Sequence, residues 1–401
     1  MKIKSFFKDI NGAKNVTEKR KNNILNSSET INKIDPINEL AKELHPGPIQ
    51  CKITRIRDVS CDVKEFRFEP VSGSLPPFEA GQYVSIIVNV LGIDTSRPYS
   101  IISAPKNALS LNPYFEICVK KCHHGFVSKY LFEDVVVGQS LMCDLPHGHF
   151  YIEPLRDTKY ILGLAGGSGI TPFISMAREI AYGKLDVNLT ILYGTKSHEE
   201  DILDDELNEI VSKCNKVKLV HVISAENEIT RFGDEKGFIN KSLIEKYSLD
   251  YKPSNGKTTY FICGPQMMYK FVLGQLMNLN VEPKRIRREI FGEINDIRED
   301  KEYPLKDPTR FDIKVIRGID ETIISALSIE SLAVSLEKNH IGIHTCCRSG
   351  ECGMCRIKVI SGDYFVPNIT DNRRRADIRF NYTHACNTYP LSNMTIKIDI
   401  I

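Results

Sequence analysis

The region from Cys51 to Ile152 alternates apolar and polar residues over short runs that are separated by glycine and proline. Runs with a period of two are typical of half-buried β-strands joined by turns. Four of them stand out, at 53–59, 63–68, 83–90 and 114–120. The pattern predicts a small antiparallel β-barrel over residues 49–155.

The pattern changes at Tyr160, where continuous apolar runs begin to alternate with helical segments. Strands are expected at 160–165, 188–194, 217–223 and 259–263, and helices at 173–182, 204–214 and 267–279. Repeated strand–helix units form a parallel sheet that binds ligands at the carboxyl ends of its strands. We therefore expect an α/β domain with a parallel sheet over residues 156–292.

A linker and a third domain follow. Residues 293–308 mix acidic, basic and proline residues without periodicity, which is typical of a linker. Regular structure is then expected as a strand, a helix and a further strand, at 311–316, 331–339 and 356–360. These elements predict an α+β domain over residues 309–401.

The first 48 residues form an N-terminal extension in this interpretation. Their basic and polar beginning is poor in core-forming residues, so we expect it to be largely disordered. One short helix is expected from Pro36 to Leu44, because Asp35 is a suitable N-cap and proline suits the first helical position.

Composition narrows the class of protein. A chain of 401 residues can hold two to four domains, and 53 basic against 51 acidic residues leave no electrostatic footprint for nucleic acid. Residues 1–9 lack the apolar core of a secretion signal, which favours the cytoplasm. The uncharged stretch 160–177 has the length of a membrane span, but four glycines and Pro172 interrupt it, so we expect no transmembrane segment.

Cysteines near the end of the chain carry the first chemical signal. Cys347, Cys352 and Cys355 follow a C-x4-C-x2-C pattern, and Cys386 stands about thirty residues further on. This is the plant-type spacing of a [2Fe-2S] cluster, in which one loop supplies three thiolates and a distant segment the fourth. Gly350 would let the loop turn back with its backbone N–H groups toward the sulfurs.

Two alternatives concern these thiols. Zinc could bind them, although zinc ribbons usually show two similar C-x2-C pairs. Cys346 could replace Cys347 in the ligand set, but we interpret it as a non-ligand that packs against the loop.

A glycine-rich turn in the α/β region carries the second signal. Gly166, Gly167, Ser168, Gly169 and Thr171 lie between a buried strand and a helix, where backbone N–H groups can cradle phosphate. We expect these residues to bind a nucleotide, although the turn lacks the G-x-G-x-x-G form.

Several short motifs, each weak alone, occur in an informative order. They are Gly81-Gln-Tyr-Val, Arg97-Pro-Tyr-Ser100, Gly125-Phe-Val-Ser128, Pro146-His-Gly-His-Phe150, the turn G-G-x-G-I-T-P, Cys263-Gly-Pro265 and Glu289-Ile-Phe291. Together they resemble the ferredoxin–NADP reductase superfamily, and the C-terminal region resembles the β-grasp ferredoxin fold. Ile290 departs from the pattern, since arginine is common at that position.

The resemblance implies roles for the flavin motifs. Arg97 would pair with a flavin phosphate, Tyr99 would stack on the isoalloxazine, and Ser100 would lie near the atom that receives hydride. The turn from Gly125 to Ser128 would offer N–H groups to a pyrophosphate, which favours FAD. The implied FAD-binding set is Arg97, Pro98, Tyr99, Ser100, Gly125, Phe126, Val127, Ser128 and Phe291.

The resemblance also implies catalytic and nucleotide-binding residues. Cys263 would lie beside the nicotinamide, together with Gly264 and Pro265, and Glu289 would lie near the flavin. Ser100, Cys263 and Glu289 are thus the candidate catalytic residues. A buried structural thiol remains the alternative for Cys263.

The loop after Gly194 bears on the choice between NADH and NADPH. Lys196 and His198 could meet a 2′-phosphate, whereas Glu199, Glu200 and Asp201 would repel it. Asp201 could hydrogen-bond a ribose hydroxyl or cap a helix. NADH is slightly favoured.

These motifs imply an NAD(P)H-dependent oxidoreductase that passes electrons through FAD and its own [2Fe-2S] cluster to a separate redox protein. The family resemblance suggests an oxygenase, a hydroxylase or a hybrid-cluster protein as that acceptor. Two alternatives remain: an electron-transfer subunit of a larger flavoenzyme complex, and a zinc-stapled binding module.

Overall fold

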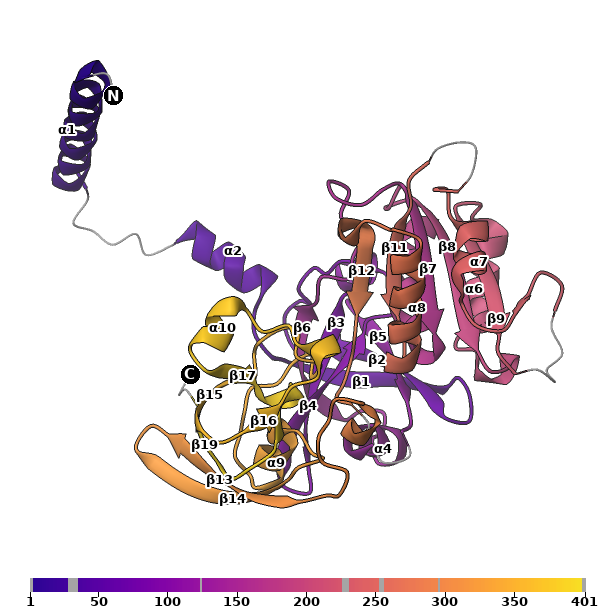
Figure 1. The fold of residues 1–401 in the computed structure, drawn as a ribbon. Helices are drawn as coiled ribbons and strands as arrows, with labels where there is room; N and C mark the ends of the chain where they lie inside the picture. The colour runs from indigo at the N-terminus through magenta and orange to yellow at the C-terminus, as the bar shows by residue number, and fades with distance from the viewer. Residues whose placement is uncertain are drawn as a thin grey trace. The chain divides into compact units, whose positions relative to one another are not determined.

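The computed structural model describes residues 3–27, 35–122, 125–225, 231–251, 256–294 and 296–398. The chain forms two compact units, Met1–Leu44 and His45–Ile401, and each is described by itself. Figure 1 shows the ribbon of both.

The N-terminal unit contains two helices, α1 (Ile3–Leu25) and α2 (Pro36–Leu44). The helix α1 differs from the prediction of a largely disordered segment. All its described side chains, from residue 12 onward, are exposed, so that part of the helix has no buried face. The predicted helix at Pro36 is confirmed, and Asp35 Oδ1 accepts from the backbone N–H groups of Ile37 and Asn38 at 3.0 and 3.3 Å.

The second unit begins with the predicted antiparallel barrel. Its six strands follow the order β4-β3-β6-β1-β2-β5. A bridge between Ile101 and Ile117 joins the two edges of this sheet. The strands are β1 (Ile49–Asp58), β2 (Val63–Pro70), β3 (Tyr83–Val90), β4 (Ile93–Ser100), β5 (Phe115–Lys120) and β6 (Ser140–His147), with helices α3 (Pro105–Ala108) and α4 (Phe126–Glu133).

The alternation of apolar and polar residues along the strands explains the interior of the barrel. Inward residues of neighbouring strands form one apolar core, in which the rings of Phe68 and Phe115 stack with centroids 5.0 Å apart. Fully burying an aromatic side chain of this size contributes roughly 2–3 kcal/mol. The core holds β4 rigidly, and β4 carries the Arg97-Pro-Tyr-Ser motif.

The predicted parallel sheet follows, with strand order β10-β9-β8-β7-β11-β12. Two short edge strands, β10 and β12, add to the four that the sequence predicts. The strands are β7 (Tyr160–Gly166), β8 (Asn188–Thr195), β9 (Val217–Ile223), β10 (Glu235–Lys236), β11 (Thr259–Cys263) and β12 (Ile286–Glu289). The helices are α5 (Thr171–Ala181), α6 (Asp204–Lys213), α7 (Lys241–Tyr247) and α8 (Gln266–Asn278).

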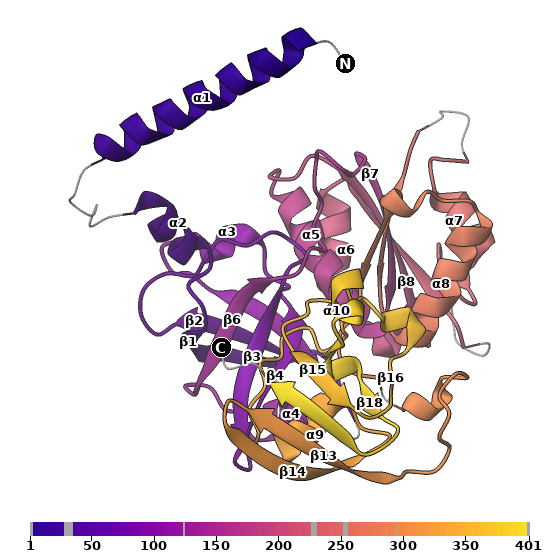
Figure 2. The same ribbon diagram turned by 60° about the vertical axis from the view of Figure 1, so that its left-hand side comes forward.

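Successive residues of each central strand enter different cores. Ile161 packs with α5 and α6 on one face of the sheet, and Leu162 packs with α7 and α8 on the other. Figure 2 shows the helices on opposite sides of the sheet. Burial on both faces explains why these strands are continuous apolar runs.

The C-terminal domain has a mixed sheet with strand order β14-β13-β19-β15-β17. Its strands are β13 (Arg310–Arg317), β14 (Asp320–Leu327), β15 (Arg356–Ser361), β17 (Tyr382–His384) and β19 (Met394–Ile398), beside a small hairpin of β16 (Tyr364–Phe365) and β18 (Tyr389–Pro390). Its helices are α9 (Leu332–Lys338) and α10 (Arg375–Arg379). The cysteine-rich loop lies between α9 and β15, where the sequence places it.

Two buried ionic clusters join the three domains. On one side, Arg178 of α5 donates to the Ile102 carbonyl at 2.9 Å and pairs with the buried Glu116 of β5. On the other side, the fully buried Arg348 of the cysteine loop donates to both carboxylate oxygens of Glu337 on α9, at 2.6 and 2.9 Å. Glu337 also accepts from Thr95 of β4 at 2.9 Å. The barrel is thereby fixed to both other domains.

The substitution Glu337→Gln should destabilise the contact between the barrel and the C-terminal domain, because it removes one carboxylate from a buried guanidinium. Arg348 keeps its ion pair with Glu293, so we expect a cost of about 1.5–3 kcal/mol, typical of a hydrogen bond to a charged group. Urea denaturation measures the change in unfolding free energy. Lys338→Gln is the matched control on the same helix, since its exposed pair with Glu330 contributes about 1 kcal/mol or less. Equal effects of the two variants would contradict the assignment.

Candidate functional site

A cavity of about 740 Å³ lies where the three domains meet. The barrel lines it with Tyr83 and His147, the parallel-sheet domain with Glu289 and Phe291, and the cysteine loop with Cys347. Residues with predicted roles for flavin and for iron–sulfur chemistry thus share one cavity.

The four predicted cluster thiols lie in two neighbouring groups. The Sγ atoms of Cys355 and Cys386 are 3.2 Å apart, and the thiol of Cys352 contacts those of Cys347 and Cys346. Backbone N–H groups point at the sulfurs: those of Ser349 and Cys352 lie 3.5 and 3.3 Å from Cys347 Sγ. Two groups of thiols with N–H donors suit the two irons of a [2Fe-2S] cluster.

The same thiols do not suit a single zinc ion. Zn–S bonds of about 2.3 Å in a tetrahedron bring sulfurs to about 3.8 Å of one another. Of the four thiols, all in the described part of the chain, no three have sulfurs mutually within 4.8 Å.

Gly350 and His384 hold the loop in its turn. Gly350 has a φ of +81°, and a Cβ there would lie 2.9 Å from the Thr370 carbonyl oxygen, so glycine is required. His384 Nδ1 lies 2.7 Å from the Gly350 carbonyl oxygen, and burial lowers the pKa of His384, so its neutral ring donates this bond. The sequence analysis assigned His384 no role, although its place two residues before Cys386 was a signal.

Cys346 contacts both the barrel and the cluster loop. Its Sγ is 3.4 Å from Tyr83 Oη, both side chains are buried, and its thiol also contacts that of Cys352. Its hydrogen bond with Tyr83 joins the cysteine loop to β3. The ligand set without Cys346 stays a prediction.

Arg97 lies on β4 and has the character of an anion-binding group. Its Nη1 donates to Thr95 Oγ1 and to the Ser96 carbonyl, both at 2.7 Å. Among the described residues no carboxylate lies within 4 Å of its guanidinium. Burial, together with the neighbouring Arg348, lowers the pKa of Arg97. A partly buried cation without a carboxylate partner fits a phosphate.

Two buried oxygens near the cavity have no hydrogen-bond partner within the described chain. They are Ser100 Oγ on β4 and Glu289 Oε2 at the end of β12. Burial raises the pKa of Glu289 well above its usual range, which favours the protonated carboxyl. A buried hydroxyl and a neutral carboxyl without partners fit a polar ring system such as isoalloxazine. Tyr99, half-buried on the same strand, leaves part of its ring free to stack.

The turn from Gly125 to Ser128 opens helix α4, as predicted. Gly125 is the residue before the helix, and Ser128 Oγ accepts from the Cys122 backbone N–H at 3.2 Å. The first N–H groups of a helix have no partner inside it and can bind phosphate. The remaining predicted flavin residues, Pro98, Phe126, Val127 and Phe291, lie on β4, on α4 and beside the cavity.

The glycine-rich turn lies at the carboxyl ends of β7 and β11. A Cβ at Gly169 would come within 2.2 Å of the Cys263 carbonyl oxygen, so only glycine allows this approach. A Cβ at Gly166 or at Gly264 would come within 2.1 or 2.8 Å of Met268 Sδ, a close packing that the sequence pattern did not predict. Thr171 Oγ1 donates to the Ser168 carbonyl at 2.9 Å and closes the turn.

Cys263 pairs with Ala165 of β7 and with Glu289 of β12 in the sheet register. This register brings the predicted nucleotide turn, Cys263 and Glu289 to the same edge of the sheet. Burial raises the pKa of Cys263 well above its usual range, so the thiol is neutral. Cys263 can pack against a ligand or position it, but it has no thiolate for nucleophilic attack.

Comparison with protein families agrees with this order of sites. Residues 50–152 match an oxidoreductase FAD-binding domain, residues 164–273 an oxidoreductase NAD-binding domain, and residues 320–391 a 2Fe-2S iron-sulfur cluster binding domain. The chain belongs to the ferredoxin–NADP reductase superfamily and has a C-terminal [2Fe-2S] ferredoxin domain. The match over residues 320–391 sets aside the zinc-stapled module.

Relatives of this reductase have the same domain content over most of their length. It is 28% identical to NADH oxidoreductase HCR of Escherichia coli over 80% of this chain and 89% of the relative. It is 26% identical to the glycine betaine monooxygenase reductase subunit of Chromohalobacter salexigens, over 88% and 95%. The fold matches phthalate dioxygenase reductase with a TM-score of 0.64 and 23% identity, over 88% of this chain and 98% of that structure.

The reductase is an NAD(P)H-dependent oxidoreductase that passes electrons through FAD and its own [2Fe-2S] cluster to a separate redox protein. FAD supplies the step between hydride transfer, which moves two electrons, and a cluster that takes one at a time. The predictions of superfamily, fold class, cofactors and reaction are thereby confirmed.

None of the described helices is long and apolar enough to cross a membrane.

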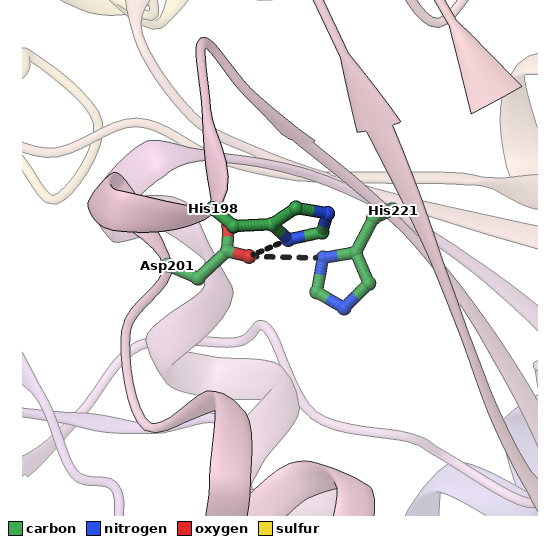
Figure 3. A group of neighbouring side chains, drawn as sticks. All are labelled: His198, Asp201 and His221. Atoms are coloured by element: carbon green, nitrogen blue, oxygen red, sulfur yellow. Dashed lines mark hydrogen bonds and ion pairs between the residues drawn. The ribbon is translucent and has the colours of Figure 1, made fainter. Parts of the chain in front are cut away.

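The side chain of Asp201 points toward His198 and His221 rather than toward a ribose, which differs from the prediction (Figure 3). Asp201 Oδ1 accepts from Thr195 Oγ1 at 2.9 Å, and Asp201 Oδ2 lies 2.7 Å from His198 Nδ1 and 3.2 Å from His221 Nδ1. Its carboxylate is buried. A ribose hydroxyl could reach Asp201 only if this network opened.

Each imidazole of the network lies between two carboxylates. The second ring nitrogen of His198 is 2.9 Å from Asp234, and that of His221 is 3.1 Å from Asp204. An imidazolium, which donates from both nitrogens, suits the position of His221, whereas a neutral ring would turn a lone pair toward a carboxylate. His198, Asp201 and His221 converge closely enough to hold a cation.

The titration of His221 should make stability depend on pH. Burial lowers the pKa of His221, but its ion pairs with Asp201 and Asp204 outweigh this effect and raise the pKa to about 9, against about 6.5 when unfolded. This stabilisation is fully present below about pH 6.5 and is lost as pH rises through about 9. We expect a loss of about 1–3 kcal/mol between these limits, measured by urea denaturation at each pH. His198, Asp234 and Arg231 complete the charged surroundings.

The variant His221→Gln should lose this pH-dependent contribution and be less stable than the wild type at pH 6.5. His340→Gln is the control, because His340 is exposed and contacts only the Gly92 carbonyl through its ring. Parallel pH profiles of His221→Gln and wild type would refute the ion-pair assignment.

Proposed function

We propose that the reductase takes electrons from NADH and delivers them singly to an oxygenase, a hydroxylase or a hybrid-cluster protein. The shared cavity supports this proposal most strongly, because Tyr83, Glu289 and Cys347 bring the flavin residues beside the cluster loop. The names of the relatives, NADH oxidoreductase HCR and a glycine betaine monooxygenase reductase subunit, agree with the proposal.

The chain's own residues bind and orient the cofactors in this proposal. Arg97 pairs with a flavin phosphate, and the N–H groups after Gly125 bind the pyrophosphate. Tyr99 stacks on the ring of FAD. Ser100 hydrogen-bonds to that ring, and Glu289 holds a proton beside it.

The nucleotide side of the proposal rests on the turn at the end of β7. Gly166, Gly167, Ser168, Gly169 and Thr171 bind the phosphates of NADH. Cys263, with Gly264 and Pro265, packs against the nicotinamide and excludes water. A neutral thiol suits this role, because it adds no charge at the place where hydride leaves.

Acidic residues after β8 favour NADH over NADPH. Glu199 is exposed and Glu200 is partly exposed, so their carboxylates repel a 2′-phosphate, although Lys196 is exposed beside them. Asp201 contributes to this preference only through the fixed shape of the loop.

The cluster ligands are Cys347, Cys352, Cys355 and Cys386 in this proposal. The domain boundaries stay as the sequence predicts: barrel 49–155, nucleotide domain 156–292, linker 293–308 and ferredoxin domain 309–401, after an extension of 48 residues. We place the reductase in the cytoplasm, because all twelve cysteines are free thiols in the structure, which suits a reducing compartment.

Absorbance spectra of the anaerobically purified protein, before and after NADH and then NADPH, test the donor and both cofactors together. Flavin bands and a long-wavelength cluster shoulder should be present, and NADH should bleach both at lower concentration than NADPH. Bleaching by NADPH alone would overturn the donor. A fixed copurifying partner, with little NADH oxidation by this chain alone, would favour the subunit of a larger flavoenzyme.

Arg97→Ala should lower the flavin content, because a phosphate loses its guanidinium partner. A charge-assisted bond of this kind contributes about 1.5–3 kcal/mol, so flavin affinity should fall by roughly 10- to 150-fold. Flavin release on dilution measures the loss. Arg317→Ala, an exposed arginine at the end of β13, is the control and should retain flavin like the wild type. Full retention by Arg97→Ala would remove Arg97 from the site.

Cys352→Ser should abolish the cluster absorbance and the transfer of electrons to protein acceptors. Reduction of a dye such as ferricyanide by NADH should survive, because the flavin can reduce it directly. Cys61→Ser is the control, since Cys61 is also exposed but lies on the barrel, outside the loop. Intact electron transfer to a protein acceptor in Cys352→Ser would show that the cluster is not the outlet.

A further inference from the structure

An exposed apolar surface lies beside the outer edge of the cluster loop. Cys352 and Met354 (41% exposed) are open to solvent on the loop, and Ile378 (52%) and Phe380 (59%) are open to solvent on and just after α10. Met354, Cys352 and Arg374 all line the cavity where the three domains meet, and Arg374 directly precedes α10, so this cavity connects the cluster loop with α10. We call the surface formed by Met354, Arg374, Arg375, Ile378, Arg379 and Phe380 the α10 face.

Arginines surround the apolar centre of the α10 face. Arg374, Arg375 and Arg379 are all exposed, and the guanidinium of Arg379 lies 5.6 Å from the centre of the Phe380 ring. In the described chain no carboxylate forms an ion pair with these three arginines. Their charges therefore face solvent.

The nearby acidic groups do not neutralise this surface. Asp377 is buried, accepts from the Arg374 backbone N–H at 3.2 Å and pairs with Arg356. Asp371 is paired with Arg373 at 2.8 Å. Arg373 itself is largely buried and also contacts the Tyr364 hydroxyl, so it lies outside the α10 face.

We propose that the α10 face is the docking site for the electron acceptor, and that this acceptor is an acidic protein with an apolar contact centre. This inference rests on the proposed function, since it names the partner chemistry for the same cluster. An apolar centre with a charged rim is the usual anatomy of a specific interface. The position of Cys352 at its edge lets the partner approach the outlet of the cluster.

Complementary charge should act mainly on the rate of encounter. Charged surfaces raise association rates by roughly 10- to 1,000-fold at low salt, and this effect decreases as the Debye length shortens. The apolar centre should act on the lifetime of the complex and depend little on salt. The two parts of the α10 face can therefore be separated experimentally.

The test uses the holoprotein with two haem proteins of opposite charge, an acidic soluble cytochrome b5 domain and the basic cytochrome c. NADH-driven reduction of cytochrome b5 should be fast at low salt and slow at high salt, whereas cytochrome c should show a slower reaction that salt accelerates. Arg375→Glu/Arg379→Glu should lower the low-salt rate with cytochrome b5 by about tenfold or more and raise that with cytochrome c. Phe380→Ser should lower the cytochrome b5 rate at every salt concentration.

A matched control carries the same change in net charge on another face of the ferredoxin domain. Arg310 and Arg317 are exposed on β13, which lies away from α10 in Figures 1 and 2. Arg310→Glu/Arg317→Glu should leave both haem proteins reacting at the wild-type rate. If this control changes the rates as much as the α10 variant, or if the α10 variant changes neither, the docking site is wrong.

Failure of the proposed function would give other results than failure of the docking site. In that case the wild type itself would lack the cluster absorbance or its bleaching by NADH. When the wild type does reduce its cluster with NADH, the docking proposal fails if the α10 variant keeps the wild-type selectivity or if the control variant changes the rates as much. Ferricyanide reduction should be unchanged in all these variants, because it does not require the α10 face.

Discussion

The buried ion pair of Arg348 with Glu337 fixes the geometry on which the reductase depends. Arg348 follows the predicted cluster ligand Cys347, is fully buried, and adopts a φ of +55°, a conformation that a long side chain rarely takes without compensation. Glu337 holds its guanidinium and also accepts from Thr95, two residues before Arg97. A buried charge without its partner is costly, so the cluster loop and the flavin strand keep one relative position.

Three buried titratable groups near the predicted cofactor sites are shifted toward their neutral forms. Burial raises the pKa values of Glu289 and Cys263 and lowers that of His384. Arg288 and Arg374 line the cavity without an ion pair in the described part of the chain and add positive potential there, whereas Arg348 is balanced by Glu337 and Glu293. Together with N–H groups aimed at the sulfurs, this arrangement favours the acceptance of negative charge without moving a proton.

Local pattern was enough to predict the barrel, the parallel sheet and the thiol ligands, because strand alternation, apolar runs and cysteine spacing are properties of neighbouring residues. The inward turn of Asp201 could not be predicted, since His221 lies twenty residues away and meets it only in the folded sheet. The same holds for the pair of Arg348 with Glu337. The helix α1 was missed for another reason: the basic and polar composition of the segment was given more weight than the helical spacing of Ile3, Phe6, Phe7 and Ile10.

Buried charged groups and exposed charged groups serve different functions in this chain. Inside, paired or neutralised groups hold cofactors at fixed positions, and unpaired charge would be destabilising. On the α10 face, by contrast, Arg375 and Arg379 are exposed and form no ion pair with the described chain, although Arg373, two residues before Arg375, is tied to Asp371. Charge left unpaired beside an exposed apolar centre is better explained by a partner than by the stability of the fold, to which exposed charges contribute little.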